Sequence, residues 1–167
     1  RENPDALGNA WFVSNYKIVL DADSEIMALS NFNPAKTAIV DQRFQNYFSG
    51  FTPSPNDTNA TIKMLSYEPN DLVYDSKSQH EALAMFSEIY YKDGWNAYID
   101  GKLTPYIRAN YVLRAMLIPS GTHKIEFKFE PKIYAIGEKI SYATSALLIL
   151  MCLAYGGYLI KMKLNAE

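Results

Sequence analysis

The stretch ISYATSALLILMCLAYGGYLI, residues 140–160, is the longest part of the sequence without a charged side chain. As a helix it would be about 31 Å long, which matches the roughly 30 Å thickness of the hydrocarbon core of a bilayer. A core helix of a soluble protein is usually shorter and keeps a polar stripe, which this stretch lacks. We therefore predict one transmembrane helix over residues 140–160, followed by a short tail over residues 161–167.

Small residues within this stretch predict contact with other transmembrane helices. Ser141 and Ser145 lie one helical turn apart, and the Gly156-Gly157 pair lets a second backbone approach closely. The sequence begins at Arg1 without a signal-peptide pattern, so we expect it to be part of a longer chain. The expected partners are membrane lipid and the transmembrane helices of that chain. Lysines flank the stretch on both sides, so charge alone leaves its orientation open.

Composition excludes several classes of function for residues 1–139, which precede the hydrophobic stretch. The chain has 16 Lys and Arg against 18 Asp and Glu, with no basic run, so nucleic acid is not an expected partner. Its single cysteine, Cys152, lies inside the hydrophobic stretch, which excludes a disulfide or a cysteine metal site upstream. His80 and His123 each lack a second ligand at metal spacing, so we expect neither a metal ion nor another cofactor.

A nearly continuous strand pattern covers residues 60–131, within a domain that we expect to span residues 1–139. Short runs rich in aromatic and β-branched residues are separated by Pro, Gly, Asn or Asp, which is typical of an antiparallel β-sandwich of immunoglobulin-like or jelly-roll-like type. The fold class is therefore mainly β. Asp100-Gly101 predicts a tight hairpin turn. The predicted strands are residues 60–67, 72–76, 81–91, 95–100, 110–118 and 122–130.

The polarity of individual strands indicates where they lie in this sandwich. In residues 122–130, apolar and charged side chains alternate, so one face meets the core and the other meets water. Residues 83–91 and 110–118 are apolar on both faces. We therefore expect these two to be central strands.

Residues 1–59 predict a short α/β portion and a loop. We expect a strand over residues 10–21, a helix from Asp23 or Ser24 to Ser30, a strand over residues 37–41 and a surface loop over residues 49–59. Glu25 would lie in the first turn of the helix, where the helix dipole favours a carboxylate.

Polar and aromatic side chains are densest between residues 88 and 114, and two interpretations stay open. In one, aromatic faces stack on sugar rings while charged groups bind hydroxyls, which makes a carbohydrate-binding patch. In the other, the rings form a sandwich core that a buried Glu88–Arg114 salt bridge locks, because a charge in an apolar strand needs a partner. The candidate residues are Glu88, Tyr90, Tyr91, Trp95, Asp100, Arg108, Asn110 and Arg114, with Tyr98 and Tyr111 beside them.

Enzyme signatures are missing from the sequence. It contains no G-x-S-x-G elbow, no H-E-x-x-H pair, no glycine-rich phosphate loop and no cysteine beside a histidine. Glu88 and Asp100 are the carboxylates that glycoside hydrolysis would require, but no second acid accompanies either one in its strand. We therefore assign no catalytic residue.

Several segments of the sequence form one combined pattern. They are SEIYYKDGWNAYIDGK (87–102), RANYVLRA (108–115), IPSGTH (118–123) and FKFEP (127–131), together with LGNAWFV (7–13), NFNP (31–34) and TAIV (37–40) near the start. This pattern resembles the C-terminal extracytoplasmic region and last transmembrane helix of YfhO-like bacterial membrane proteins, and the resemblance covers nearly the whole chain. Where members of the family often have a Tyr-Tyr-Pro-Gly-Trp turn, this sequence has YYKDGW at residues 90–95, one residue longer.

This resemblance implies a large polytopic protein of the bacterial cytoplasmic membrane, grouped with glycosyltransferases that transfer sugar from a polyprenyl-phosphate carrier to cell-envelope polymers. The active carboxylates of such enzymes lie in loops between earlier helices, so none is carried onto this chain. Residues 1–139 would be a non-catalytic accessory domain outside the cytoplasm, and residues 161–167 a cytoplasmic tail. An envelope glycan or a lipid-linked sugar is then an expected ligand; the alternative is a purely structural domain that stabilises the transmembrane body.

Overall fold

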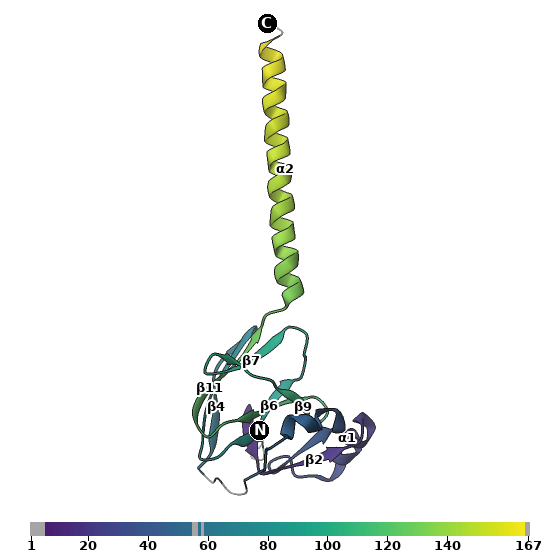
Figure 1. The fold of residues 1–167 in the computed structure, drawn as a ribbon, viewed down its shortest axis with the longest axis vertical. Helices are drawn as coiled ribbons and strands as arrows, with labels where there is room; N and C mark the ends of the chain where they lie inside the picture. Colours follow the sequence, from purple (N-terminus) through teal and green to yellow (C-terminus); the bar gives the residue numbers. More distant parts are fainter. Residues whose placement is uncertain (1–5, 55–56, 58, 166–167) are drawn as a thin grey trace. The chain divides into compact units, whose positions relative to one another are not determined.

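A computed structural model describes residues 6–54, 57 and 59–165. The chain divides into two compact units, residues 1–129 and residues 130–167, which we describe separately. Its helices and strands follow one another along the chain as shown in Figure 1. They are β1 (Ala10–Val13), β2 (Asn15–Val19), α1 (Ala22–Ala28), η1 (Leu29–Asn31), β3 (Thr37–Asp41), η2 (Gln42–Phe48), β4 (Thr61–Glu68), β5 (Asp71–Ser78), β6 (Ala82–Ile89), β7 (Trp95–Ile99), β8 (Lys102–Leu103), β9 (Ile107–Ala109), β10 (Leu113–Ile118), β11 (Gly121–Phe129) and α2 (Lys132–Leu164).

The first unit is a sandwich built on a four-stranded antiparallel sheet in the order β1-β6-β10-β9. A second antiparallel sheet, β4-β5-β11-β7-β8, covers one face of this sheet. The other face packs on a small α/β portion in which β2 and β3 pair in parallel. The predicted mainly β sandwich with an α/β portion is therefore confirmed.

Strand β6 shows why the middle sheet carries apolar residues on both faces. Because side chains alternate along a strand, Leu83 and Met85 enter the core beneath the α/β portion, whereas Ala84 and Phe86 enter the core between the two larger sheets. In the second core, Phe86 meets Phe127 edge to face at a centroid distance of 4.9 Å. The prediction that residues 83–91 and 110–118 contain the central strands is confirmed, since β6 and β10 each have a neighbour on both sides.

The N-terminal portion differs from the prediction at two points. The single strand expected over residues 10–21 is broken at Ser14, because β1 pairs with β6 in the middle sheet while β2 pairs with β3. The cap of α1 is neither Asp23 nor Ser24 but Asp21, whose carboxylate accepts a hydrogen bond from the Ser24 backbone N–H at 2.8 Å. The strand over residues 37–41 is confirmed as β3.

The predicted hairpin turn is confirmed between β7 and β8. Asp100 and Gly101 have φ angles of 50° and 78°, as a turn that follows the twist of its strands requires. Strands β8 and β9 were not predicted, because with two and three residues they are too short to show alternation.

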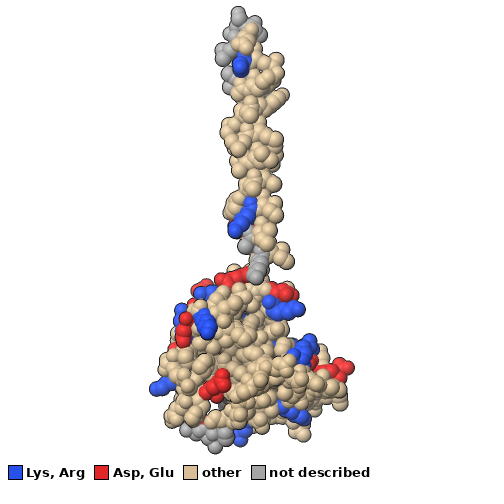
Figure 2. All heavy atoms as spheres, viewed as in Figure 1, with Lys and Arg blue, Asp and Glu red and all other residues tan. Residues whose placement is uncertain are grey.

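The second unit consists of helix α2, which contains the predicted transmembrane stretch and begins eight residues before it. Within the described part of the chain, the segment Ile136–Lys163 is long and apolar enough to cross a membrane. Figure 2 shows that the charged side chains visible on this helix lie towards its two ends. The helix therefore presents to its surroundings the uncharged surface that a bilayer requires.

Candidate functional site

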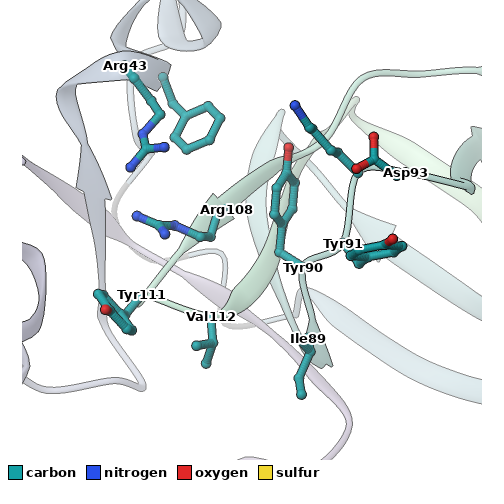
Figure 3. Close-up of a pocket in the computed structure, with 10 residues that line it drawn as sticks. Arg43, Ile89, Tyr90, Tyr91, Asp93, Arg108, Tyr111 and Val112 are labelled. Atoms are coloured by element: carbon teal, nitrogen blue, oxygen red, sulfur yellow. The ribbon is translucent and has the colours of Figure 1, made fainter. Parts of the chain in front are cut away.

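An open pocket of about 580 Å³ lies on the first unit, where the loop after β6 meets η2 and the turn between β9 and β10. Figure 3 shows the guanidinium groups of Arg43 and Arg108 projecting toward one another beside the ring of Tyr90. This mixture of aromatic rings, cations and aliphatic groups characterises the site. The lining residues are Arg43, Phe44, Ile89, Tyr90, Tyr91, Lys92, Asp93, Arg108, Tyr111 and Val112.

A buried carboxylate, Glu25 of α1, holds one wall of this pocket. It is fully buried and accepts a hydrogen bond from the Arg108 guanidinium at 2.5 Å and another from the Tyr111 backbone N–H at 2.8 Å. Asp41 lies between the arginines, with its carboxylate 2.6 Å from Arg43 and 3.6 Å from Arg108. The hydrogen bond from Arg43 holds the pKa of Asp41 below its ordinary value.

The turn between β9 and β10 is held in an unusual backbone conformation. Asn110 and Tyr111 have φ angles of 48° and 71°, a region that costs free energy for a residue with a bulky side chain. Asn110 is fixed because its side-chain oxygen accepts a hydrogen bond from the Ile39 backbone N–H, and its own N–H donates to the Ile39 carbonyl, both at 2.8 Å. Together with the Glu25 bond to Tyr111, these contacts place the Tyr111 ring 5.3 Å from the Arg108 guanidinium.

The two adjacent tyrosines of the pocket differ in their surroundings. Tyr90 is half-buried, with its ring edge to face with Phe44 at 6.2 Å and Tyr106 at 5.4 Å, and this burial raises the pKa of its hydroxyl. Tyr91 is 54% exposed. Tyr90 therefore forms a fixed wall, whereas the Tyr91 ring is accessible to a ligand.

A second group of predicted residues lies at the core between the two larger sheets and does not line the pocket. Arg114 is only 3% exposed, and its guanidinium lies 4.3 Å from the centroid of the Trp95 ring and 5.0 Å from that of Phe127. Its Nε donates a hydrogen bond to the Ile89 carbonyl at 3.0 Å. Burial lowers the pKa of Arg114, while the nearby charge of Glu88 opposes that shift.

The predicted Glu88–Arg114 salt bridge is not formed. Among the ion pairs of the described residues, no carboxylate approaches Arg114 within 4.0 Å. Two aromatic rings and one carbonyl contact the guanidinium instead, because Arg114 lies where Trp95 and Phe127 close the core.

Asp100 lies apart from both groups, in the turn that ends β7. Its carboxylate is 2.7 Å from Nδ1 of His123 and accepts a hydrogen bond from the Lys124 backbone N–H at 2.9 Å. Glu88 belongs to β6 of the middle sheet, whereas Asp100 follows β7 of the second sheet.

The candidate residues thus divide among three places. The pocket brings together Tyr90, Tyr91 and Arg108, with Asn110 supporting the turn beside them; Glu88, Trp95 and Arg114 lie near the core; Asp100 lies in the hairpin turn. Sequence reasoning missed Asp41, Arg43 and Phe44, and it placed Glu25 in a helix without a partner. Glu25 lies 83 positions from Arg108, and no sequence pattern signals that contact.

Comparisons with known proteins identify the family but provide no related structure. No curated protein and no solved structure matches the chain. The family model described as "Bacterial membrane protein YfhO" matches residues 45–141, which is more than half of the 167 residues. The match runs from η2 through β11 into α2, so it includes Tyr90, Arg108 and Tyr111 of the pocket. The chain therefore belongs to the YfhO family of bacterial membrane proteins.

Proposed function

We propose that residues 1–129 form a non-catalytic accessory domain of a membrane glycosyltransferase, and that this domain binds or orients a glycan in the pocket. In this proposal the domain lies on the extracytoplasmic side of the bacterial cytoplasmic membrane, and α2 anchors it there with Lys161 inside. The observation that carries the proposal is the meeting of Tyr90, Tyr91 and Tyr111 with two guanidinium groups in one open pocket.

The chemistry of the lining suits sugar hydroxyls and rings. Arg43 and Arg108 present fixed N–H donors, and the carboxylates of Asp41 and Glu25 balance their charges. A neutral sugar can therefore bind without stripping a free charge of its water. The exposed ring of Tyr91 offers an apolar face to the ring of a pyranose.

The pocket supports binding rather than catalysis. Among the described residues that line the pocket, Asp93 alone carries a carboxylate. Glycosyl transfer or hydrolysis that uses two acidic residues requires a second carboxylate. Glu25 and Asp41 are already engaged by arginine side chains. We therefore propose that the catalytic acids of the parent protein lie outside residues 1–129.

A purely structural role is the second candidate, and one observation favours it. Trp95 and Arg114, which the sequence offered as part of a sugar platform, contact each other and the core of the sandwich. A domain that only stabilises the transmembrane body would use all its aromatic residues in this way.

Retention on immobilised cell-envelope polysaccharide separates these functions. The detergent-solubilised chain should be retarded, and Tyr91→Ala should weaken binding about tenfold, which corresponds to about 1.4 kcal/mol. Tyr67→Ala is the matched control, because Tyr67 is a comparably exposed tyrosine, 63% against 54%, on β4 and outside the pocket. No retention of the parent chain, or equal losses in both variants, would favour the structural role.

A further inference from the structure

A second pocket, of about 670 Å³, lies on the first unit and shares no lining residue with the pocket of the candidate site. The turn and strand that follow β7 form one wall, with Asp100 and Leu103, and the loop that joins β10 to β11 contributes Pro119. His123, near the start of β11, lines the same pocket. Its side chain is therefore placed to connect two walls of the second pocket.

Both nitrogens of the His123 ring face a hydrogen-bond acceptor. Nδ1 lies 2.7 Å from a carboxylate oxygen of Asp100, and Nε2 lies 3.2 Å from the carbonyl oxygen of Ser120. The other carboxylate oxygen of Asp100 accepts a hydrogen bond from the Lys124 backbone N–H at 2.9 Å. A carbonyl and an ionised carboxylate can only accept, whereas a neutral imidazole has a single N–H. With Asp100 ionised, both contacts are therefore satisfied only by the doubly protonated, positively charged ring.

The surroundings of the ring fix its position. The side chain of His123 is only 18% exposed. Gly121, in the same loop, has a φ angle of 126°, and a Cβ atom there would lie 3.1 Å from Nε2 of His123. On β5 the residue opposite His123 is Ser76, whose hydroxyl donates a hydrogen bond to the His123 carbonyl at 3.2 Å. The imidazole therefore occupies a space that a side chain at residue 121 would fill.

Asp100 is the charged partner of the His123 ring. The hydrogen bond from Asp100 raises the pKa of His123 above its ordinary value, and the same bond lowers the pKa of Asp100. Glu81 and Lys102 also line the pocket, and among the described residues Glu81 forms no ion pair with His123 within 4.0 Å. Charged residues next to His123 and Ser76 in their strands point to the opposite face of the sheet, because side chains alternate; they are Asp75, Lys77 and Lys124.

We propose that His123 is a proton-dependent latch that joins the β7–β8 turn to the β10–β11 loop and thereby sets the shape of the second pocket. When Nε2 gives its proton to solvent, Nδ1–H stays with Asp100, because a hydrogen bond to a charged acceptor is the stronger one. Nε2 then presents a lone pair to the Ser120 carbonyl, and the two acceptors repel each other. The loop is thus released from the wall that Asp100 belongs to. None of these residues lines the candidate glycan site, so the latch does not rest on the proposed function.

The latch is closed over a defined range of pH. Because the pKa of His123 is raised in the folded state, its contribution to stability is present below the ordinary value of about 6.5 and is lost as pH rises through the folded value. The contribution of Asp100, whose folded pKa is depressed, is lost as pH falls through that folded value. The β10–β11 loop is therefore released on the alkaline side of the His123 titration.

Nuclear magnetic resonance of isotopically labelled histidine rings tests the proposal in the full chain, reconstituted into nanodiscs. The chain has two histidines, and the exposed His80 serves as a reference in the same sample. During a pH titration, the ring nitrogens of His123 should keep the spectrum of an imidazolium to a higher pH than those of His80. Asp100→Asn should remove most of this difference, whereas Asp75→Asn, an exposed acid on the opposite face of the sheet, should leave it unchanged. If His123 titrated at or below the pH at which His80 titrates, the proposal would be overturned.

A second measurement tests whether the proton changes the pocket. Leu103 and Leu117 line the pocket, so their methyl resonances should shift with the same midpoint as the His123 ring. Leu65 on β4 is the matched control, because it is as exposed as Leu103, 65% against 62%, and lies outside the pocket. In His123→Gln, which cannot take up a proton in this range, the pH response of Leu103 should disappear. A His123 titration that left both pocket leucines unshifted would show a static ion pair and overturn the latch.

Discussion

Arg108 and Arg114 lie directly opposite each other on paired strands, yet their environments differ completely. Arg108 belongs to β9, the edge strand of the middle sheet, and it reaches the carboxylates of α1 and β3 while lining an open pocket. Arg114 belongs to β10, a central strand, and it is covered by Trp95 and Phe127.

The difference shows that the position of a strand in the sheet determines the surroundings of an arginine side chain. Two like charges facing each other across strands are unfavourable, so each arginine requires its own compensation. At the edge, compensation comes from acids in a separate part of the chain and leaves the other side of the guanidinium facing a cavity. At the centre only core groups are within reach, so the arginine becomes part of the packing.

The largest effect should come from breaking the compensation of Arg108. Glu25→Gln removes a fully buried charge that binds both Arg108 and the Tyr111 backbone, so we expect a loss of about 3 to 5 kcal/mol in the free energy of unfolding. Asp23→Asn, an exposed acid in the same helical turn, is the control and should change stability by less than about 0.5 kcal/mol. Urea unfolding of both variants measures the difference, and equal stabilities would show that Glu25 does not hold the pocket wall.

The next effect compares an aromatic ring from each environment. Trp95→Ala should cost about 2 to 3 kcal/mol, because its half-buried ring contacts Arg114 and lies 5.4 Å from the Phe129 ring. Tyr91→Ala, at an exposed position of the pocket, should cost less than about 0.5 kcal/mol. The melting temperatures of the two variants and the parent measure this difference. If Trp95→Ala melted like the parent, Trp95 would be free for a ligand, as the interpretation of a carbohydrate-binding patch requires.

A smaller effect should follow from removing Arg114 itself. Arg114→Met loses two cation–π contacts and one hydrogen bond but also removes the cost of burying a charge, so we expect a net loss of about 1 to 2 kcal/mol. Glu88→Gln should change stability by less than about 1 kcal/mol, because Glu88 has no ion pair within 4.0 Å of Arg114. Equal and large losses of stability in both variants would indicate that the predicted salt bridge forms.

The smallest effect concerns how steeply the melting temperature falls at low pH. Because the folded pKa of Asp41 is depressed by Arg43, its contribution to stability is present above the unfolded value of about 3.9 and is lost as pH falls through the folded value. We therefore expect the melting temperature to fall less steeply below pH 5 in Asp41→Asn than in the parent. Arg114→Met should keep the acid dependence of the parent, since no carboxylate is paired with Arg114; a changed dependence there would contradict the contrast between the two arginines.

Much of the fold could be predicted, because its signals are local. The strand over residues 37–41, the two central strands and the Asp100-Gly101 turn all follow from patterns that extend over a few residues. The break at Ser14 could not be predicted, since β1 and β2 carry similar residues and differ only in the partner strand with which each is paired.

For the candidate site, the available residue types and the position of the membrane helix follow from the sequence, because hydrophobic length and alternation are properties of the chain itself. Which side chains meet depends on the folded structure. It brought Glu25 beside Arg108, placed Arg43 at the same pocket, and withdrew Trp95 and Arg114 into the packing of the core. The physical reason is that a charged side chain in a sheet is stabilised by partners distant in sequence, and strand order determines which of them lie within reach.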